Sequence, residues 1–252
     1  YGPVIWLTDK KLTYSVGNQA YPYPIYEVKK ECFHSSVEEV TLSIKNEFIP
    51  NLKSQNVIGM IEGKNAKKTI VLSAHYDHLG RMGKEAYFPG ANDNASGVAM
   101  LLYMANYFSK NQPPFNIVFM AFGGEEAGLL GSKHYVTNPL FPLKDIHFLL
   151  NLDIMGTGEE GITVVNGAVF KKQFATMVKI NNKKGYLAKV KVRGKAANSD
   201  HYFFSEAGVP AFFVYTMGGV SYYHDVFDQS KTLPLNEFDN LFLLFRDFIL
   251  KV

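Results

Sequence analysis

Cysteine is almost missing from this chain, which has 252 residues and a single thiol at Cys32. One thiol excludes an internal disulfide framework and a zinc site built from four thiolates. We expect Cys32 to be a buried core residue. Long hydrophobic runs are missing too, because none reaches the roughly 18 apolar residues that a membrane-spanning helix needs. The sequence therefore predicts no membrane span.

Charge of one sign is not in excess, because 26 basic side chains stand against 23 acidic ones and give a net charge of +3. The basic residues are scattered along the sequence, which argues against nucleic acid as a partner. Hydrophobic residues make up 47% of the chain, a share typical of a packed core, and this excludes a disordered chain. One domain over residues 1–252 is the simplest organisation at this length, and the oligomeric state is left open.

The N-terminal segment, residues 1–35, differs from the rest of the chain. Two short β-like pieces, Val4–Leu7 and Ile25–Val28, fit an edge hairpin, a lid or the tail of a preceding module. Ser36, with Glu39 three residues later, forms a capping box and predicts a helix that starts there. Because the chain begins at Tyr1 without Met or a leader segment, we expect a mature or trimmed product, whose sequence does not report its own targeting signal. The expected location is secreted or periplasmic.

After this segment, apolar strands alternate with helices. Buried strands are predicted at residues 69–74, 116–122, 146–152, 162–165 and 210–216, and an edge strand at 187–192. Apolar residues spaced by three and four predict a helix over 98–108, and a second apolar helix is predicted to start near Asn236. Such alternation is typical of a mostly parallel sheet covered by helices on both faces. We therefore predict an α/β fold with three layers, α/β/α.

Side chains that can bind metal or move protons follow the predicted strands and fill the loops between them. Ligands bind beyond the carboxyl ends of strands in such sheets. The residues at these positions are His75, Asp77, Asp93, Glu125, Glu126, Asp153 and His224. So many carboxylates at one edge would repel each other without a cation, and buried carboxylates persist when they are paired or bound to metal. Mixed imidazole and carboxylate ligands suit zinc, or two adjacent zinc ions where one carboxylate bridges them.

Motifs of other hydrolases and of nucleotide-binding proteins are missing. The sequence has no His-Glu-x-x-His metalloprotease motif and no Gly-x-Ser-x-Gly nucleophile elbow. Gly63-Lys64 lacks the phosphate-loop pattern, and the glycines between 123 and 131 do not form a dinucleotide fingerprint. The strand-end cluster is therefore the candidate site.

With these motifs in place, the sequence resembles the co-catalytic zinc aminopeptidases of clan MH. They include bacterial leucyl aminopeptidase, aminopeptidase Y and the catalytic domain of glutamate carboxypeptidase. Five segments match in the family's order: Ala74–Asp77, Gly90–Gly97, Phe122–Ser132, Asn151–Asp153 and Tyr223–His224. The match covers roughly Asn56 to the C-terminus. The resemblance implies a zinc-exopeptidase, phosphorylase/hydrolase-like fold, with residues 1–35 as a poorly matched segment that resembles the end of a protease-associated insert.

The resemblance also implies a ligand set for two zinc ions per chain. His75 and Asp153 are expected to bind one ion, and Glu126 and His224 the other. Asp93 is expected to bridge the two ions. All five are residue types that zinc accepts. The implied substrates are peptides with a free N-terminus, from which N-terminal residues would be hydrolysed by a water molecule that bridges the metals.

Three further residues receive catalytic roles from the resemblance. Glu125 would be the general base. Asp77 would hold the His75 ring through its other nitrogen, as metal-bound histidines usually require. Tyr223 would donate a hydrogen bond to the oxyanion. The family also has a cis peptide after its bridging aspartate, here Asp93–Asn94.

Nearby polar residues are expected to support the site. We expect His78 to act behind the ligands, and Asp200 and His201 to brace the substrate pocket or its loop. The segment after His224 lacks the Thr-Pro that is common in the family, but Asp228 stands where a family carboxylate is expected.

Two other functions share this fold. A glutaminyl cyclase uses one zinc for an acyl transfer, and such cyclases typically lose the first histidine ligand, which His75 retains here. A non-catalytic receptor-type domain loses ligands that this chain keeps. The preferred N-terminal residue and the exopeptidase direction are left open.

Overall fold

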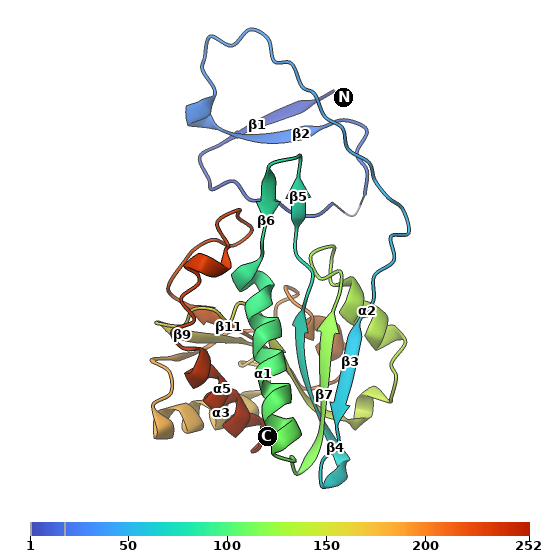
Figure 1. Ribbon diagram of the computed structural model, residues 1–252, viewed down its shortest axis with the longest axis vertical. Helices are drawn as coiled ribbons and strands as arrows, with labels where there is room; N and C mark the ends of the chain where they lie inside the picture. The colour runs from blue at the N-terminus through green and yellow to red at the C-terminus, as the bar shows by residue number, and fades with distance from the viewer. Residues whose placement is uncertain (1, 18) are drawn as a thin grey trace. The chain divides into compact units, whose positions relative to one another are not determined.

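The computed structural model describes residues 2–17 and 19–252, and the chain divides into two units, Tyr1–Lys53 and Ser54–Val252. In the first unit, β1 (Val4–Thr8) pairs with β2 (Ile25–Lys29) in parallel (Figure 1). The parallel direction rules out the hairpin considered for these pieces, because a tight turn joins only antiparallel strands. Whether this unit is a lid or the tail of another module stays a prediction.

Two sequence predictions fail in the first unit. Cys32 ends the short 3₁₀ helix Lys30–Cys32 and is exposed, so the expected buried thiol is wrong. The helix predicted from Ser36 is also absent, since residues 37–49 have no regular structure. Val40, Ile44 and Phe48 are each about 45% exposed, so no apolar face is buried there. A capping box cannot sustain a short helix alone, because helices of this length depend on tertiary packing.

The second unit is built on a seven-stranded sheet in the order β10-β9-β11-β8-β4-β7-β3 (Figure 1). The strands are β3 (Val57–Ile61), β4 (Asn65–His75), β7 (Phe115–Phe122), β8 (Ile146–Leu152), β9 (Gly161–Val165), β10 (Val190–Val192) and β11 (Ala211–Met217). Four pairings are parallel, while β3–β7 and β9–β11 are antiparallel. The predicted mostly parallel sheet is confirmed, with β10 as the predicted edge strand.

Helices cover both faces of this sheet. One layer contains α1 (Ser96–Lys110), α3 (Lys171–Lys184) and α5 (Phe238–Ile249), and the other contains α2 (Leu130–Thr137) and α4 (His201–Glu206). Figure 1 shows α1 and α5 running along the sheet. The three-layer α/β/α prediction is confirmed, and α1 and α5 are the two helices that the apolar periodicity predicts.

The central strand β4 shows how the sequence produces two cores. Ile70 and Leu72 pack on the side of α1 and α5, whereas Val71 between them packs on the side of α2 and α4. Alternate residues of a strand point to opposite faces, so a continuous apolar run is the signature of a strand buried on both faces. Each fully buried side chain of this kind contributes about 1.5–3 kcal/mol.

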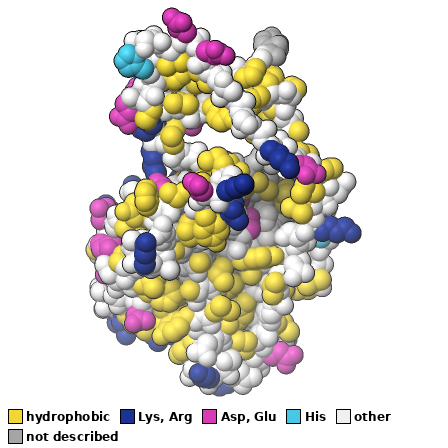
Figure 2. Space-filling model, turned by 45° about the horizontal axis from the view of Figure 1, so that its top comes forward, with side chains coloured by type: hydrophobic (Ala, Val, Ile, Leu, Met, Phe, Trp, Pro, Cys, Tyr) yellow, Lys and Arg dark blue, Asp and Glu magenta, His cyan; other side chains and the backbone are white. Residues whose placement is uncertain are grey.

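Shorter elements complete the unit. A small hairpin joins β5 (Gly80–Met82) to β6 (Ala86–Phe88), and short 3₁₀ helices cover Leu143–Asp145 and Ser230–Thr232. Among the described residues, no helix is both long and apolar enough to span a membrane. On the face shown in Figure 2, Lys and Arg side chains are dispersed among acidic and uncharged ones.

Candidate metal centre

The predicted site residues lie at one edge of the sheet because four central strands run in the same direction. β4 is parallel to β7 and β8, and β11 is parallel to β8, so their carboxyl ends coincide. His75 is the last residue of β4, and Asp153 directly follows β8. Glu125 and Glu126 follow β7, and His224 lies in the loop after β11.

Asp93 reaches the same place from the turn before α1. The peptide bond between Asp93 and Asn94 is cis, as the resemblance implies. The carboxylate of Asp228 fixes this turn, because it accepts hydrogen bonds from the backbone N–H groups of Asn92 at 2.8 Å and Asp93 at 3.0 Å. The first turn of α1 packs tightly against β8, since a Cβ on Gly97 would lie 2.5 Å from the Leu152 carbonyl oxygen. The Asp228 carboxylate therefore fixes the backbone of Asp93, and the helix that follows is seated closely on β8.

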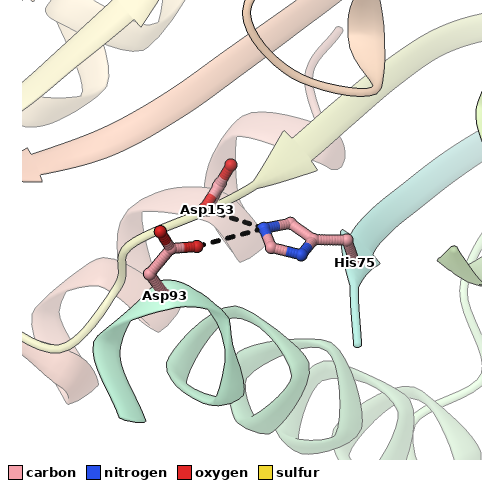
Figure 3. A group of neighbouring side chains, drawn as sticks. All are labelled: His75, Asp93 and Asp153. Atoms are coloured by element: carbon pink, nitrogen blue, oxygen red, sulfur yellow. Dashed lines mark ion pairs between the residues drawn. The ribbon is translucent and has the colours of Figure 1, made fainter. Parts of the chain in front are cut away.

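One oxygen of Asp93 faces a first pair of ligands, His75 and Asp153, which we name the strand-end group. Nε2 of His75 lies 3.3 Å from Oδ1 of Asp93 and 3.5 Å from Oδ1 of Asp153. Figure 3 shows the His75 ring directed at both carboxylates. All three side chains are buried.

The other oxygen of Asp93 faces a second pair, Glu126 and His224, which we name the loop group. Nε2 of His224 lies 3.5 Å from Oδ2 of Asp93 and 3.2 Å from Oε2 of Glu126. The remaining oxygen of Glu126, Oε1, lies 2.8 Å from Nδ1 of His78. The structure thus brings all five predicted metal ligands together, with Asp93 between the two pairs.

Two features of the strand-end group suit a metal ion: buried ligand atoms without hydrogen-bond partners, and the types of those atoms. Nε2 of His75 and Oδ1 of Asp153 are buried without a hydrogen-bond partner among the described residues. Ligand atoms of His75, Asp93 and Asp153 all lie within 4.8 Å of one another. Zinc is commonly bound by an imidazole nitrogen together with carboxylate oxygens. The strand-end group offers this set of donor atoms, buried and directed at one point.

A buried chain of polar side chains ties Asp153 to the sheet. Ser199 donates from Oγ to Oδ2 of Asp153 at 3.0 Å, and Asn151 donates from Nδ2 to Oγ of Ser199 at 2.7 Å. Ser73 on β4 donates to Oδ1 of Asn151 at 2.8 Å. Sequence reasoning singled out Asp200 and His201 in this loop but missed the contact of Ser199, because nothing in the local sequence tells which of the three side chains reaches Asp153.

Asp77 contacts the site in a different way from the one expected. Its backbone carbonyl oxygen lies 3.1 Å from Nδ1 of His75, whereas its carboxylate is 3.8 Å from that nitrogen. The carboxylate instead accepts hydrogen bonds from the backbone N–H groups of Glu125 at 3.1 Å and Glu126 at 3.2 Å. Asp77 therefore positions the loop after β7 as well as the His75 ring.

The two adjacent glutamates have opposite electrostatic surroundings. Burial raises the pKa of Glu125 to about 9, against the attraction of His75 and with repulsion from Asp153 adding to the rise. Burial also acts on Glu126, but hydrogen bonds from His224 and His78 outweigh it and lower its pKa to about 2. Glu126 is thus a permanent carboxylate, while Glu125 holds a proton unless positive charge is nearby.

The remaining predicted residues line or brace the site. The ring of Tyr223 stacks on His224, with centroids 3.9 Å apart, and lines the same cavity as the ligands. Partial burial and the carboxylates Asp93 and Glu126 raise the pKa of the Tyr223 phenol, so it stays a hydrogen-bond donor. Asp200 and His201, next to Ser199 in the sequence, are fully buried, and their bracing role stays a prediction.

Sequence comparison gives the centre a family context. Residues 56–249 match the Peptidase family M28. Aminopeptidase YwaD of Bacillus subtilis (strain 168) is 37% identical over 140 residues, which are 54% of this chain and 30% of the relative. An aminopeptidase of Pseudomonas aeruginosa (strain UCBPP-PA14) is 36% identical over 117 residues, 46% of this chain and 20% of the relative. The chain thus spans less than a third of these curated relatives.

Structural comparison agrees with the sequence match. BSAP, a zinc aminopeptidase from Bacillus subtilis, superposes with a TM-score of 0.66 at 28% identity, over 77% of this chain and 49% of that one. A glutaminyl cyclase from an Acidobacteriales bacterium reaches a TM-score of 0.67 at 23% identity, over 77% of this chain and 72% of that one. At that identity, the second likeness shows the fold alone.

Proposed function

Because the chain belongs to peptidase family M28, we propose that it is a zinc-dependent aminopeptidase that hydrolyses N-terminal residues from peptides. One observation carries the proposal: the two carboxylate oxygens of Asp93 face two separate pairs of zinc-type ligands, at 3.3 and 3.5 Å from their histidines. This arrangement supports two zinc ions per chain, held by the strand-end group and the loop group with Asp93 shared. A secreted or periplasmic location stays a prediction.

When bound by the strand-end group and the loop group, zinc would supply Lewis acidity toward the peptide carbonyl and would acidify the attacking water. Glu125 takes the proton from that water as it attacks the carbonyl carbon, and then delivers the proton to the leaving amine. Its carboxylate form requires positive charge nearby, since Glu125 alone has a pKa of about 9. In the loaded site, Glu125 would therefore be a carboxylate that can accept the proton.

Two other contacts would orient the substrate. Tyr223 lines the cavity and can donate its phenolic hydrogen to the charge that develops on the carbonyl oxygen. The free amino group of the substrate would be bound by the carboxylates of Glu125 and Asp153. This pairing needs a charged amine and therefore favours cleavage at the N-terminus.

The two alternative functions are less well supported. His75, which glutaminyl cyclases typically lose, stands at the centre of the strand-end group here. All five ligands and the base are retained, unlike in a receptor-type domain. Zinc content separates these functions: about two ions per chain supports the peptidase, one ion supports the cyclase, and none supports the receptor-type domain.

The test uses leucine 4-nitroanilide and an N-acetylated counterpart, each with and without a zinc chelator. We expect hydrolysis of the free-amine substrate only, loss of activity with chelator, and recovery with added zinc. Glu125→Gln should keep its zinc yet lower kcat by about 10²–10⁴-fold, because the proton acceptor is gone. The exposed control Glu85→Gln should match wild type. Equal hydrolysis of the acetylated substrate, or near wild-type kcat in Glu125→Gln, would contradict the proposal.

A further inference from the structure

A cavity of about 200 Å³ adjoins the metal centre. One side of it is formed by the predicted ligands and Glu125. The rest of its lining includes Ile154, Arg193, Asn198, Phe213 and Tyr215, which come from the turn after β8, from the segment after β10 and from β11 itself. These lining residues combine the apolar side chains of Ile154 and Phe213 with one cationic side chain, Arg193.

Arg193 is attached firmly to the sheet. Its backbone N–H donates to the carbonyl oxygen of Val164 at 2.9 Å, and its own carbonyl oxygen accepts from the N–H of Ala168 at 3.2 Å. These two bonds fix the point from which the side chain extends. Among the described residues, the guanidinium has one hydrogen bond, a long contact of 3.4 Å from Nη1 to the hydroxyl of Tyr215.

The guanidinium has no carboxylate partner within ion-pair distance among the described residues. The acidic side chains that line the cavity are Glu125 and the predicted ligands Asp93, Glu126 and Asp153. Arg193 therefore keeps several N–H donors available, arranged in the planar fork that matches a carboxylate. Asn198, which also lines the cavity, can add an amide donor.

From this arrangement we propose that Arg193 makes the cavity a binding site for a carboxylate of the peptide substrate. This proposal rests on the proposed aminopeptidase function and names its substrate class. Ile154 and Phe213 would contact the aliphatic part that carries the carboxylate, and Arg193 would bind its oxygens. The carboxylate can come from the side chain of an acidic N-terminal residue or from the C-terminus of a dipeptide.

Two substrate pairs distinguish these sources. The first pair is glutamate 4-nitroanilide and glutamine 4-nitroanilide, which differ only in the side-chain carboxylate. The second is Leu-Leu and Leu-Leu amide, which differ only at the C-terminus. In wild type we expect kcat/KM to favour the carboxylate member of one pair by roughly tenfold, the effect of a charge-assisted hydrogen bond at an exposed side chain. The pair that shows the preference identifies the source.

Arg193→Gln should abolish that preference, while zinc content and thermal unfolding stay as in wild type. The matched control is Lys191→Gln, which removes one positive charge from an exposed position on β10 outside the cavity lining, and it should keep the preference. The proposal is overturned if wild type prefers neither carboxylate substrate, or if Arg193→Gln leaves the preference intact. If wild type cleaves no free-amine substrate, including leucine 4-nitroanilide, the aminopeptidase function itself fails and this proposal with it.

Discussion

On one side of Asp93, His75 and Asp153 stand at the ends of two central strands, whereas on the other side Glu126 and His224 stand in loops. The strand-end group is held in place by the hydrogen-bonded strands β4 and β8. The buried polar side chains that connect Ser73 to Asp153 add to this support. The loop group depends on side-chain contacts, chiefly the bond between His78 and Glu126.

The difference concerns how much freedom each ligand pair loses when it binds metal. Side chains held by packing and by outer hydrogen bonds are already in place, so less conformational entropy is lost on binding. His75 is 1% exposed and His224 is 8% exposed, in a loop where its φ is +52°. We therefore expect the strand-end group to hold its zinc more tightly, so that a chelator removes the ion of the loop group first.

The largest effect is expected from Asp93→Ala, because Asp93 is the only ligand that the two groups share. Both groups should lose their ion, and hydrolysis of leucine 4-nitroanilide should fall by several orders of magnitude. The measurement is zinc per chain after gel filtration, with Asp145→Ala, at an exposed position, as control. A variant that keeps two ions would show that the groups do not share Asp93, and the comparison between them would lose its basis.

Much of this centre could be predicted from sequence, for a physical reason. His75, Glu126 and Asp153 each follow an apolar run that is buried on both faces, and parallel strands bring such ends together. The bond of His78 to Glu126 and that of Ser199 to Asp153 depend on side chains 48 and 46 residues apart, and no local pattern indicates such pairs.

Sequence patterns predicted poorly where the outcome depends on contacts with distant parts of the chain. Ser36 and Glu39 match the capping-box pattern, but no helix forms there, because the residues that follow bury no apolar face. Arg193 follows the short, largely exposed edge strand β10, where an exposed cation is the ordinary expectation. Only the cavity that Arg193 shares with the metal centre gives it a candidate role.

A smaller effect is expected from Ser199→Ala, which removes the hydrogen bond to the outer oxygen of Asp153. Outer-shell partners of this kind change metal affinity by about 10–100-fold. The loss should fall on the strand-end ion and narrow the difference between the two affinities, as measured by competition with a chelating dye. Ser109→Ala, on the exposed end of α1, serves as control. If the weaker site changed instead, the assignment of the tighter ion to the strand-end group would be wrong.

The smallest effect is expected from His78→Ala. This variant should widen the difference between the two zinc affinities, whereas Ser199→Ala should narrow it. His78 binds Oε1 of Glu126 and so leaves Oε2 directed at His224 and Asp93. Without His78 the Glu126 carboxylate can rotate, but its backbone stays fixed because Asp77 accepts from its N–H. We therefore expect about a tenfold loss of zinc affinity, confined to the loop-group ion. This is the lower end of the effect of residues that hydrogen-bond to a metal ligand.

The difference between the two zinc affinities of His78→Ala should widen in the same dye competition. His134→Ala, at an exposed position on α2, should leave that difference unchanged. Loss of both ions in His78→Ala would mean that the two groups are not held independently, and equal affinities in wild type would remove the distinction between strand-borne and loop-borne ligands.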